Sequence, residues 1–165
     1  MSEMVCSFTG HRVIKNTHRN SITALILRAV SYSYDRGCRI FMSGGALGFD
    51  TLAAREVIRF KMTHPDVRLH LILPCINQDA KWNQAEINSY RFLLENADEI
   101  VYISEEYTDN CMKERNCYLA QNADIIISYV GSEISGSAQT VRMARKLQKQ
   151  IYNLYPTLDK ESGNI

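Results

Sequence analysis

The sequence predicts an α/β domain of the doubly wound type, with a mostly parallel sheet of about six strands and helices on both faces. Three observations predict this class. Short apolar runs typical of strands recur about every thirty residues, the length of one strand-and-helix unit. Helical periodicity fills the intervals between them. The fifth run, Asp124–Tyr129, has an unbroken apolar centre, as expected of a strand that is covered on both faces.

The strand-like runs are predicted in chain order at Met4–Phe8, Cys38–Met42, Val67–Leu73, Glu99–Ile103, Asp124–Tyr129 and Gln150–Leu154. The first helix places apolar residues at 22, 25, 26, 29 and 30 on one face and ends at Gly37. The second carries apolar residues from Phe49 to Phe60. The third is expected from Asp79, as its N-cap, to about Asn96. The last two are predicted at Asn110–Asn122 and Ser137–Lys149.

These elements predict one Rossmann-like domain over residues 1–155, followed by a loose polar tail at 156–165. The formal net charge of +1 gives no reason to expect broad attraction to nucleic acid or anionic lipid. The sequence shows no signal peptide, and no apolar run approaches the ~20 residues of a membrane helix. Five cysteines without a C-x-x-C pair are typical of reduced thiols. We therefore expect a cytoplasmic protein, with no membrane partner and no metal site.

Three strands run into loops that are rich in glycine, hydroxyl or basic residues. The first leads into Thr9-Gly10-His11-Arg12, the second into the segment Ser43–Asp50, and the fifth into Gly131–Ser137. Doubly wound sheets bind ligands outside the carboxyl ends of their strands. We therefore predict a site for a nucleotide-like, phosphate-bearing ligand at this edge of the sheet.

The second loop holds Gly44, Gly45 and Gly48 directly before a helix, which favours close approach of an anion to backbone N–H groups. Asp50 suits a ribose hydroxyl, and its place at a helix N-terminus predicts that it stays ionised. The alternative is a tight turn with Asp50 as an ordinary first-turn acid. The spacing is neither G-x-G-x-x-G nor a Walker A motif, which disfavours classical dinucleotide and ATPase sites.

The first and last loops supply the other candidate groups. Arg12 offers a planar fork for a phosphate, and His11 either donates to the same group or is held by backbone. Ser137 either binds the ligand or simply caps its helix. The remaining histidines, His18, His64 and His70, are interpreted as surface, turn and strand residues.

Taken together, the motifs resemble the YpsA-like proteins of the SLOG superfamily, which also includes the LOG phosphoribohydrolases and the DNA-processing protein DprA. The similarity covers about Val5 to Lys146 and rests on Thr-Gly-His-Arg, Ser-Gly-Gly-Ala-Leu-Gly-Phe-Asp, Leu-Pro, Trp82, Met112 with Arg115-Asn116, and Ala123-Asp124 in this order. It implies a Rossmann-like fold and a site for nucleotides or nucleotide-derived signals. The predicted ligand-binding residues are Thr9, Gly10, His11, Arg12, Ser43, Gly44, Gly45, Ala46, Gly48, Asp50, Trp82, Arg115, Asn116, Gly131, Ser135, Gly136, Ser137 and Thr140.

Two departures from the family pattern have effects that the sequence leaves open. The last loop usually reads Gly-Gly-Thr-x-x-Thr, whereas this chain has Ser135 at the first glycine. Arg55 stands where family members tend to have an acid, with Glu56 one helical step away. The LOG enzymes also carry a catalytic glutamate after this loop. Here the corresponding stretch ends at Thr140 and contains no glutamate, which disfavours phosphoribohydrolase activity.

These observations predict binding or sensing of a nucleotide or ADP-ribose-like ligand in a bacterial cytosol, without turnover and without a resident cofactor beyond such a ligand. The first alternative is an enzyme that cleaves a nucleotide N-glycosidic bond, with Asp50 or Glu133 as acid or base. The second is a DprA-like binder of single-stranded nucleic acid, which the neutral charge disfavours. Homo-oligomerisation is left open.

Overall fold

Six parallel strands form one sheet in the computed structural model, which describes residues 3–163. Their spatial order is β4-β3-β2-β1-β5-β6, and every neighbouring pair is parallel. The strands are β1 Met4–Gly10, β2 Cys38–Ser43, β3 Arg68–Cys75, β4 Glu99–Ser104, β5 Ile125–Tyr129 and β6 Gln150–Asn153. The predicted strands are thus all present, and four of them, β1 to β4, are longer at the carboxyl end.

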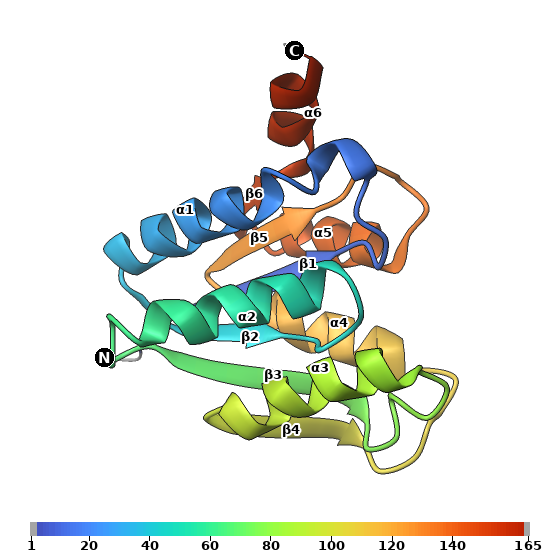
Figure 1. Cartoon of the computed structure of the whole chain (residues 1–165). Helices are drawn as coiled ribbons and strands as arrows, with labels where there is room; N and C mark the ends of the chain where they lie inside the picture. Colours follow the sequence, from blue (N-terminus) through green and yellow to red (C-terminus); the bar gives the residue numbers. More distant parts are fainter. Residues whose placement is uncertain (1–2, 164–165) are drawn as a thin grey trace.

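Helices cover both faces of this sheet (Figure 1). One face carries α1 Ile22–Asp35, α2 Phe49–Lys61 and α3 Gln84–Asn96, and the other carries α4 Cys111–Gln121 and α5 Gly136–Lys146. A short 3-10 helix, η1 at Asn16–His18, precedes α1, and α6 at Tyr155–Gly163 follows β6. This three-layer arrangement confirms the predicted doubly wound, Rossmann-like class.

The core lies between the sheet and its helices and explains the apolar strand pattern. Every residue of β5 is buried, because α1 and α2 pack over one face of the sheet and α4 and α5 over the other. Cys6 and Cys38 are fully buried free thiols, as expected of core residues. Phe49, at the start of α2, stacks on Tyr129 with ring centroids 5.7 Å apart. That contact joins the glycine loop to the end of β5.

The topology opens a crevice beside β1. After β4, at one edge of the sheet, the chain crosses to β5, which pairs with the opposite side of β1 from β2. The connections that leave β1 and β5 therefore diverge, and a space remains outside their carboxyl ends. The first and fifth strand loops singled out in the sequence both lead into this space.

Two predicted boundaries are wrong. The third helix begins at Gln84 instead of near Asp79, because Asn83 accepts a hydrogen bond from the Glu86 N–H (2.9 Å) while Glu86 accepts one from the Asn83 N–H (3.0 Å). The segment after Pro156 is also not loose, since Tyr155–Gly163 forms α6 and Leu158 is 1% exposed. Residues 164 and 165 lie outside the described part.

His18 is likewise a correction, since its side chain is fully buried where the sequence suggested a surface position. Its two ring nitrogens contact Tyr129 of β5 and Asp159 of α6, partners that are more than a hundred residues away in the chain. Within residues 3–163, the structure contains no helix with the length and apolar character needed to span a membrane.

Candidate functional site

A cavity of about 340 Å³ lies beside the end of β1, between one face of α4 and the first turns of α2 and α5. Most of the predicted ligand residues meet there. Its lining comprises Thr9, Gly10, His11, Arg12, Ala46, Asp50, Met112, Arg115, Asn116, Leu119, Ser135, Gly136 and Ser137.

One wall of this cavity is a face of α4. Met112, Arg115, Asn116 and Leu119 stand at i, i+3, i+4 and i+7, the spacing that places side chains on one side of a helix. Position in the chain gave Arg115 and Asn116 little weight, and the predicted ligand-binding residues did not include Met112 and Leu119. The helical spacing from Arg115 and Asn116 was the signal that could have found both.

Seven predicted residues lie outside the lining: Ser43, Gly44, Gly45, Gly48, Trp82, Gly131 and Thr140. Ser43 is buried and ties the loop together, since its hydroxyl donates to the Asp50 carbonyl (3.0 Å) and accepts from the Gly45 N–H (3.2 Å). Thr140 is also buried and donates to the Gly136 carbonyl at 3.1 Å within its own helix. These residues support the site without facing it.

The glycine loop is shaped by packing instead of by open approach to a ligand. Gly45 has a φ of +65°, and a Cβ there would stand 2.7 Å from the Leu73 side chain, away from the cavity. Gly48 has a φ of +79°, and a Cβ would meet the Arg12 carbonyl oxygen at 2.1 Å. The two positions need glycine because the backbone is left-handed and its neighbours leave no space.

Asp50 is the acidic group of the cavity and is 6% exposed. Its Oδ2 accepts a long hydrogen bond from the Ala46 N–H (3.4 Å), whereas its buried Oδ1 has no partner in residues 3–163. Burial raises the pKa of Asp50 to about 6, against the opposing effects of Arg115, the Ala46 N–H and Arg12. The expected lowering of this pKa by the helix dipole is therefore wrong, because desolvation by burial outweighs the positive groups nearby. With a pKa of about 6 the carboxyl group is still mostly ionised at neutral pH.

Arg115 provides the buried positive charge and is 5% exposed. Its Nη1 donates to the Gly44 carbonyl at 2.7 Å, and its Nε donates to the Asn116 side-chain oxygen at 3.0 Å. Burial lowers the pKa of Arg115, while Asp50 opposes this shift. The guanidinium thus locks α4 to the glycine loop and leaves the amide of Asn116 at the cavity wall.

His11 is held by backbone, the second of the two alternatives for this residue. Its Nε2 accepts the Gly131 N–H at 2.8 Å, and its own N–H donates to the Tyr129 carbonyl at 3.2 Å. Burial lowers the pKa of His11, which favours the neutral ring. Because Nε2 accepts, the proton of that neutral ring lies on Nδ1.

The N-terminus of α5 presents free donors to the cavity. Ser135, and not Ser137, is the N-cap, and its hydroxyl accepts the Ala138 N–H at 3.0 Å. Its φ of −100° is ordinary, so this position does not require the glycine found in the family pattern. In residues 3–163 the N–H groups of Gly136 and Ser137 have no hydrogen-bond partner. They are donors of the kind that bind anions.

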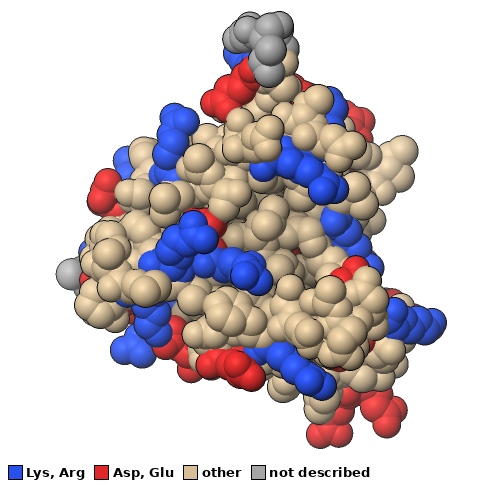
Figure 2. All heavy atoms as spheres, in the orientation of Figure 1, with Lys and Arg blue, Asp and Glu red and all other residues tan. Residues whose placement is uncertain are grey.

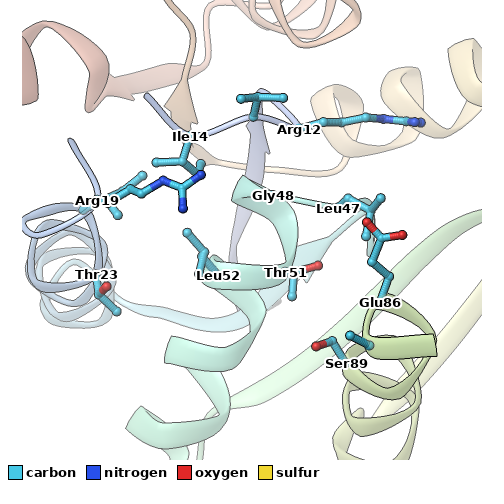
Figure 3. Close-up of a pocket in the computed structure, with 13 residues that line it drawn as sticks. Arg12, Ile14, Arg19, Thr23, Leu47, Gly48, Thr51, Leu52, Glu86 and Ser89 are labelled. Atoms are coloured by element: carbon cyan, nitrogen blue, oxygen red, sulfur yellow. The ribbon is translucent and has the colours of Figure 1, made fainter. Parts of the chain in front are cut away.

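Trp82 borders a second cavity of about 670 Å³, which shares Arg12 and Met112 with the first. A third hollow of about 590 Å³ lies over the starts of α1, α2 and α3, and Figure 3 shows Arg19 reaching into it. Arg12 borders all three spaces. Arg55 lines none of them, and its guanidinium lies 5.0 Å from the centre of the Phe92 ring.

Comparison with known proteins agrees with this fold. A UPF0398 protein of Halalkalibacterium halodurans is 28% identical over 144 residues, 86% of this chain and 72% of that protein. DprA of Streptococcus pneumoniae superposes with a TM-score of 0.66 at 16% identity, over 92% of this chain and 50% of DprA. DprA of Helicobacter pylori, described for its single-stranded DNA binding mode, gives a TM-score of 0.61 at 21% identity, over 90% of this chain and 64% of that one.

The chain thus spans about half to two thirds of the DprA chains, whose likeness shows the fold alone. The family model of YpsA, described as the YspA SLOG family, matches residues 10–158, which include every loop of the cavity. The chain therefore belongs to the YpsA family of SLOG proteins.

Proposed function

We propose that this protein binds a nucleotide or nucleotide-derived ligand of the ADP-ribose type in the bacterial cytosol. The observation that carries the proposal is that one cavity contains two kinds of group without a hydrogen-bond partner. These are the buried Asp50 Oδ1, which is an acceptor, and the N–H groups of Gly136 and Ser137, which are donors. A buried acceptor without a donor destabilises the fold, and a hydrogen bond from a ligand hydroxyl would relieve that cost.

Each part of such a ligand has a matching group. The phosphate is assigned to the α5 N-terminus and the Arg12 guanidinium, which together supply N–H donors and positive charge. The sugar hydroxyls are assigned to Asp50. The base is assigned to the neighbouring cavity beside Trp82, which is reached past Arg12 and Met112. Cavities of about 340 and 670 Å³ fall in the usual size range of small-molecule sites.

Thermal unfolding with a panel of adenine nucleotides, NAD and ADP-ribose tests the proposal. A ligand at about 100 times its Kd contributes roughly 2.7 kcal/mol, and a domain of this size shifts by ~2–4 °C per kcal/mol. We expect a shift of several degrees for a member of the panel, and its loss in Arg12→Ala. Arg145→Ala, an exposed arginine outside the three cavities, is the matched control. A panel that shifts nothing contradicts the proposal.

One observation favours a second candidate, cleavage of an N-glycosidic bond. A general acid needs a carboxyl group with a pKa near the working pH, and the buried Asp50, with a pKa raised to about 6, meets that requirement. Incubation with AMP, NAD and ADP-ribose, followed by chromatography of the released base, distinguishes the two functions. Base release that disappears in Asp50→Asn and persists in Arg145→Ala makes the protein an enzyme. Binding without release supports a sensor.

A further inference from the structure

His11 is the cavity residue most closely tied to the C-terminal helix. The ring of Tyr155, the first residue of α6, meets His11 edge to face at 5.9 Å and His18 at 4.8 Å. Gly131, whose N–H binds His11, lies directly against the same ring, since a Cβ there would fall 2.3 Å from its Cζ. The Tyr155 ring therefore packs against both partners of the His11–Gly131 hydrogen bond.

A second set of contacts fixes α6 to the segment that follows His11. Asp159 accepts from Lys15 Nζ (3.1 Å) and from His18 Nε2 (2.7 Å). The other ring nitrogen of His18 lies 2.7 Å from the Tyr129 hydroxyl, which accepts the Lys15 backbone N–H at 3.1 Å. With a neutral His18 ring, Tyr129 donates to Nδ1 and Nε2–H donates to Asp159, so every group is satisfied.

The two sets of contacts converge on the cavity. The Tyr129 carbonyl accepts the His11 N–H at 3.2 Å, so the residue that anchors His18 also anchors the backbone of His11. Leu158, between Tyr155 and Asp159 in sequence, is 1% exposed and belongs to the main hydrophobic core. Helix α6 is thus held by three contacts: Leu158 is buried in the core, Asp159 hydrogen-bonds, and Tyr155 packs by its ring.

We propose that Tyr155 and Asp159 are positioning residues, which hold His11 with Nε2 on the Gly131 N–H and its Nδ1–H as the group offered to the ligand. This inference rests on the proposed ligand site, because its functional consequence is exerted through His11. It also deepens that proposal. An Nδ1–H donor pairs with an acceptor, so the ligand atom beside His11 is an acceptor such as a phosphate, carbonyl or hydroxyl oxygen, and not an amino group that can only donate.

The test uses the full chain and begins without ligand. In the wild type we expect nitrogen chemical shifts of a neutral Nδ1–H ring for His11 and slow hydrogen exchange of the Gly131 amide. Tyr155→Ala should give a mixture of His11 tautomers and exchange of that amide about tenfold faster, because local opening governs exchange. Tyr155→Phe keeps the ring and should match the wild type. Lys160→Ala, exposed on the same helix, is the second control.

Asp159→Asn is an independent variant that keeps the apolar packing of α6. It should shift the His11 and Gly131 signals in the same direction as Tyr155→Ala, to a smaller extent, and it carries the test if Tyr155→Ala does not fold. Affinity for ADP-ribose should fall about fivefold in either variant through loss of one oriented hydrogen bond.

The outcomes separate the two proposals. Unchanged His11 shifts and Gly131 exchange in both variants overturn the positioning role, whatever the ligand result. Changed signals in a protein that binds no member of the nucleotide panel contradict the proposed function and leave the positioning of His11 in place. Changed signals with unchanged affinity show that α6 orders His11 and that His11 does not contact the ligand, which overturns the functional part of the inference.

Discussion

Asp50 and Arg115 are both nearly buried, and Asp50 takes part in none of the ion pairs found among residues 3–163. Arg115 instead donates its hydrogen bonds to the Gly44 carbonyl and the Asn116 side-chain oxygen. A carboxyl group left without water and without a close counter-ion is held at a cost to the fold. Such residues concentrate at functional sites, where a bound ligand can provide the hydrogen-bond donor that the protein lacks.

The free-energy cost of burying the ionised Asp50 side chain should be visible in the pH dependence of stability. Its pKa is raised from 3.8 to about 6 in the folded state, so the folded protein binds the proton more tightly than the unfolded chain. The stability contributed by this proton is complete below about pH 4 and is lost as the pH rises through about 6. Between these limits the wild type should lose on the order of 3 kcal/mol relative to Asp50→Asn, which does not titrate. Urea unfolding of both proteins at several pH values measures this difference in unfolding free energy. A difference that does not change with pH would show that Asp50 is not desolvated.

Two glycines offer a matched pair of substitutions with opposite consequences. Gly45→Val should destabilise the fold by at least 1–3 kcal/mol, because the backbone is left-handed there and Leu73 fills the space. Gly136→Ala should fold normally, since the nearest atom to its Cβ is the Asn116 amide nitrogen at 3.6 Å. That methyl group nevertheless enters the cavity wall beside the free N–H groups, so the ligand-induced melting shift should shrink. A Gly45→Val protein as stable as the wild type would contradict the packing described for the loop.

At the scale of elements, hydrogen-bonded caps and buried anchors set the boundaries that periodicity left open. The third helix starts where Asn83 and Glu86 cap each other, although Asp79 is an equally suitable N-cap by residue type. The last helix is short and largely polar, and nothing in its composition requires it to be ordered. Its order comes from Leu158, Asp159 and Tyr155, all of which find partners from distant parts of the chain.

The docking of α6 makes a prediction about stability. Leu158→Ala should destabilise the protein by about 2–5 kcal/mol, the usual cost of truncating a fully buried leucine. Lys160→Ala, two positions further along the same helix and exposed, should change the free energy of unfolding by less than about 0.5 kcal/mol. Chemical denaturation of both variants measures the difference. Equal stabilities would mean that residues 155–163 do not pack on the domain in solution.

For the molecule as a whole, the surface charge bears on the remaining alternative, a binder of single-stranded nucleic acid. Figure 2 shows Lys and Arg interspersed with Asp and Glu over the face in view, in keeping with a net charge of +1. A protein that neutralises many phosphates loses affinity steeply with salt, with a slope of roughly −0.7 per phosphate for single strands. We expect oligonucleotide binding to be weak and its salt slope to be shallower than about −2. Tight binding with a steep slope would replace the nucleotide proposal with a DprA-like function.

The sequence by itself determined the fold class, the strand order along the chain and most of the cavity lining. Local patterns suffice for these, because strand and helix periodicities reflect which faces are covered, and parallel topology brings the carboxyl ends of strands to one edge. The sequence alone therefore suffices to assign Thr9–Arg12, Ser135–Ser137 and Asp50 to one site.

The tertiary structure alone decided the raised pKa of Asp50, the anchoring of His11, the burial of His18 and the order of α6. Each depends on partners distant in sequence: His11 on Gly131, His18 on Asp159, and α6 on the core around Leu158. Desolvation and long-range hydrogen bonds act between groups that only the folded chain brings together, so they leave no periodicity for a sequence pattern to reveal.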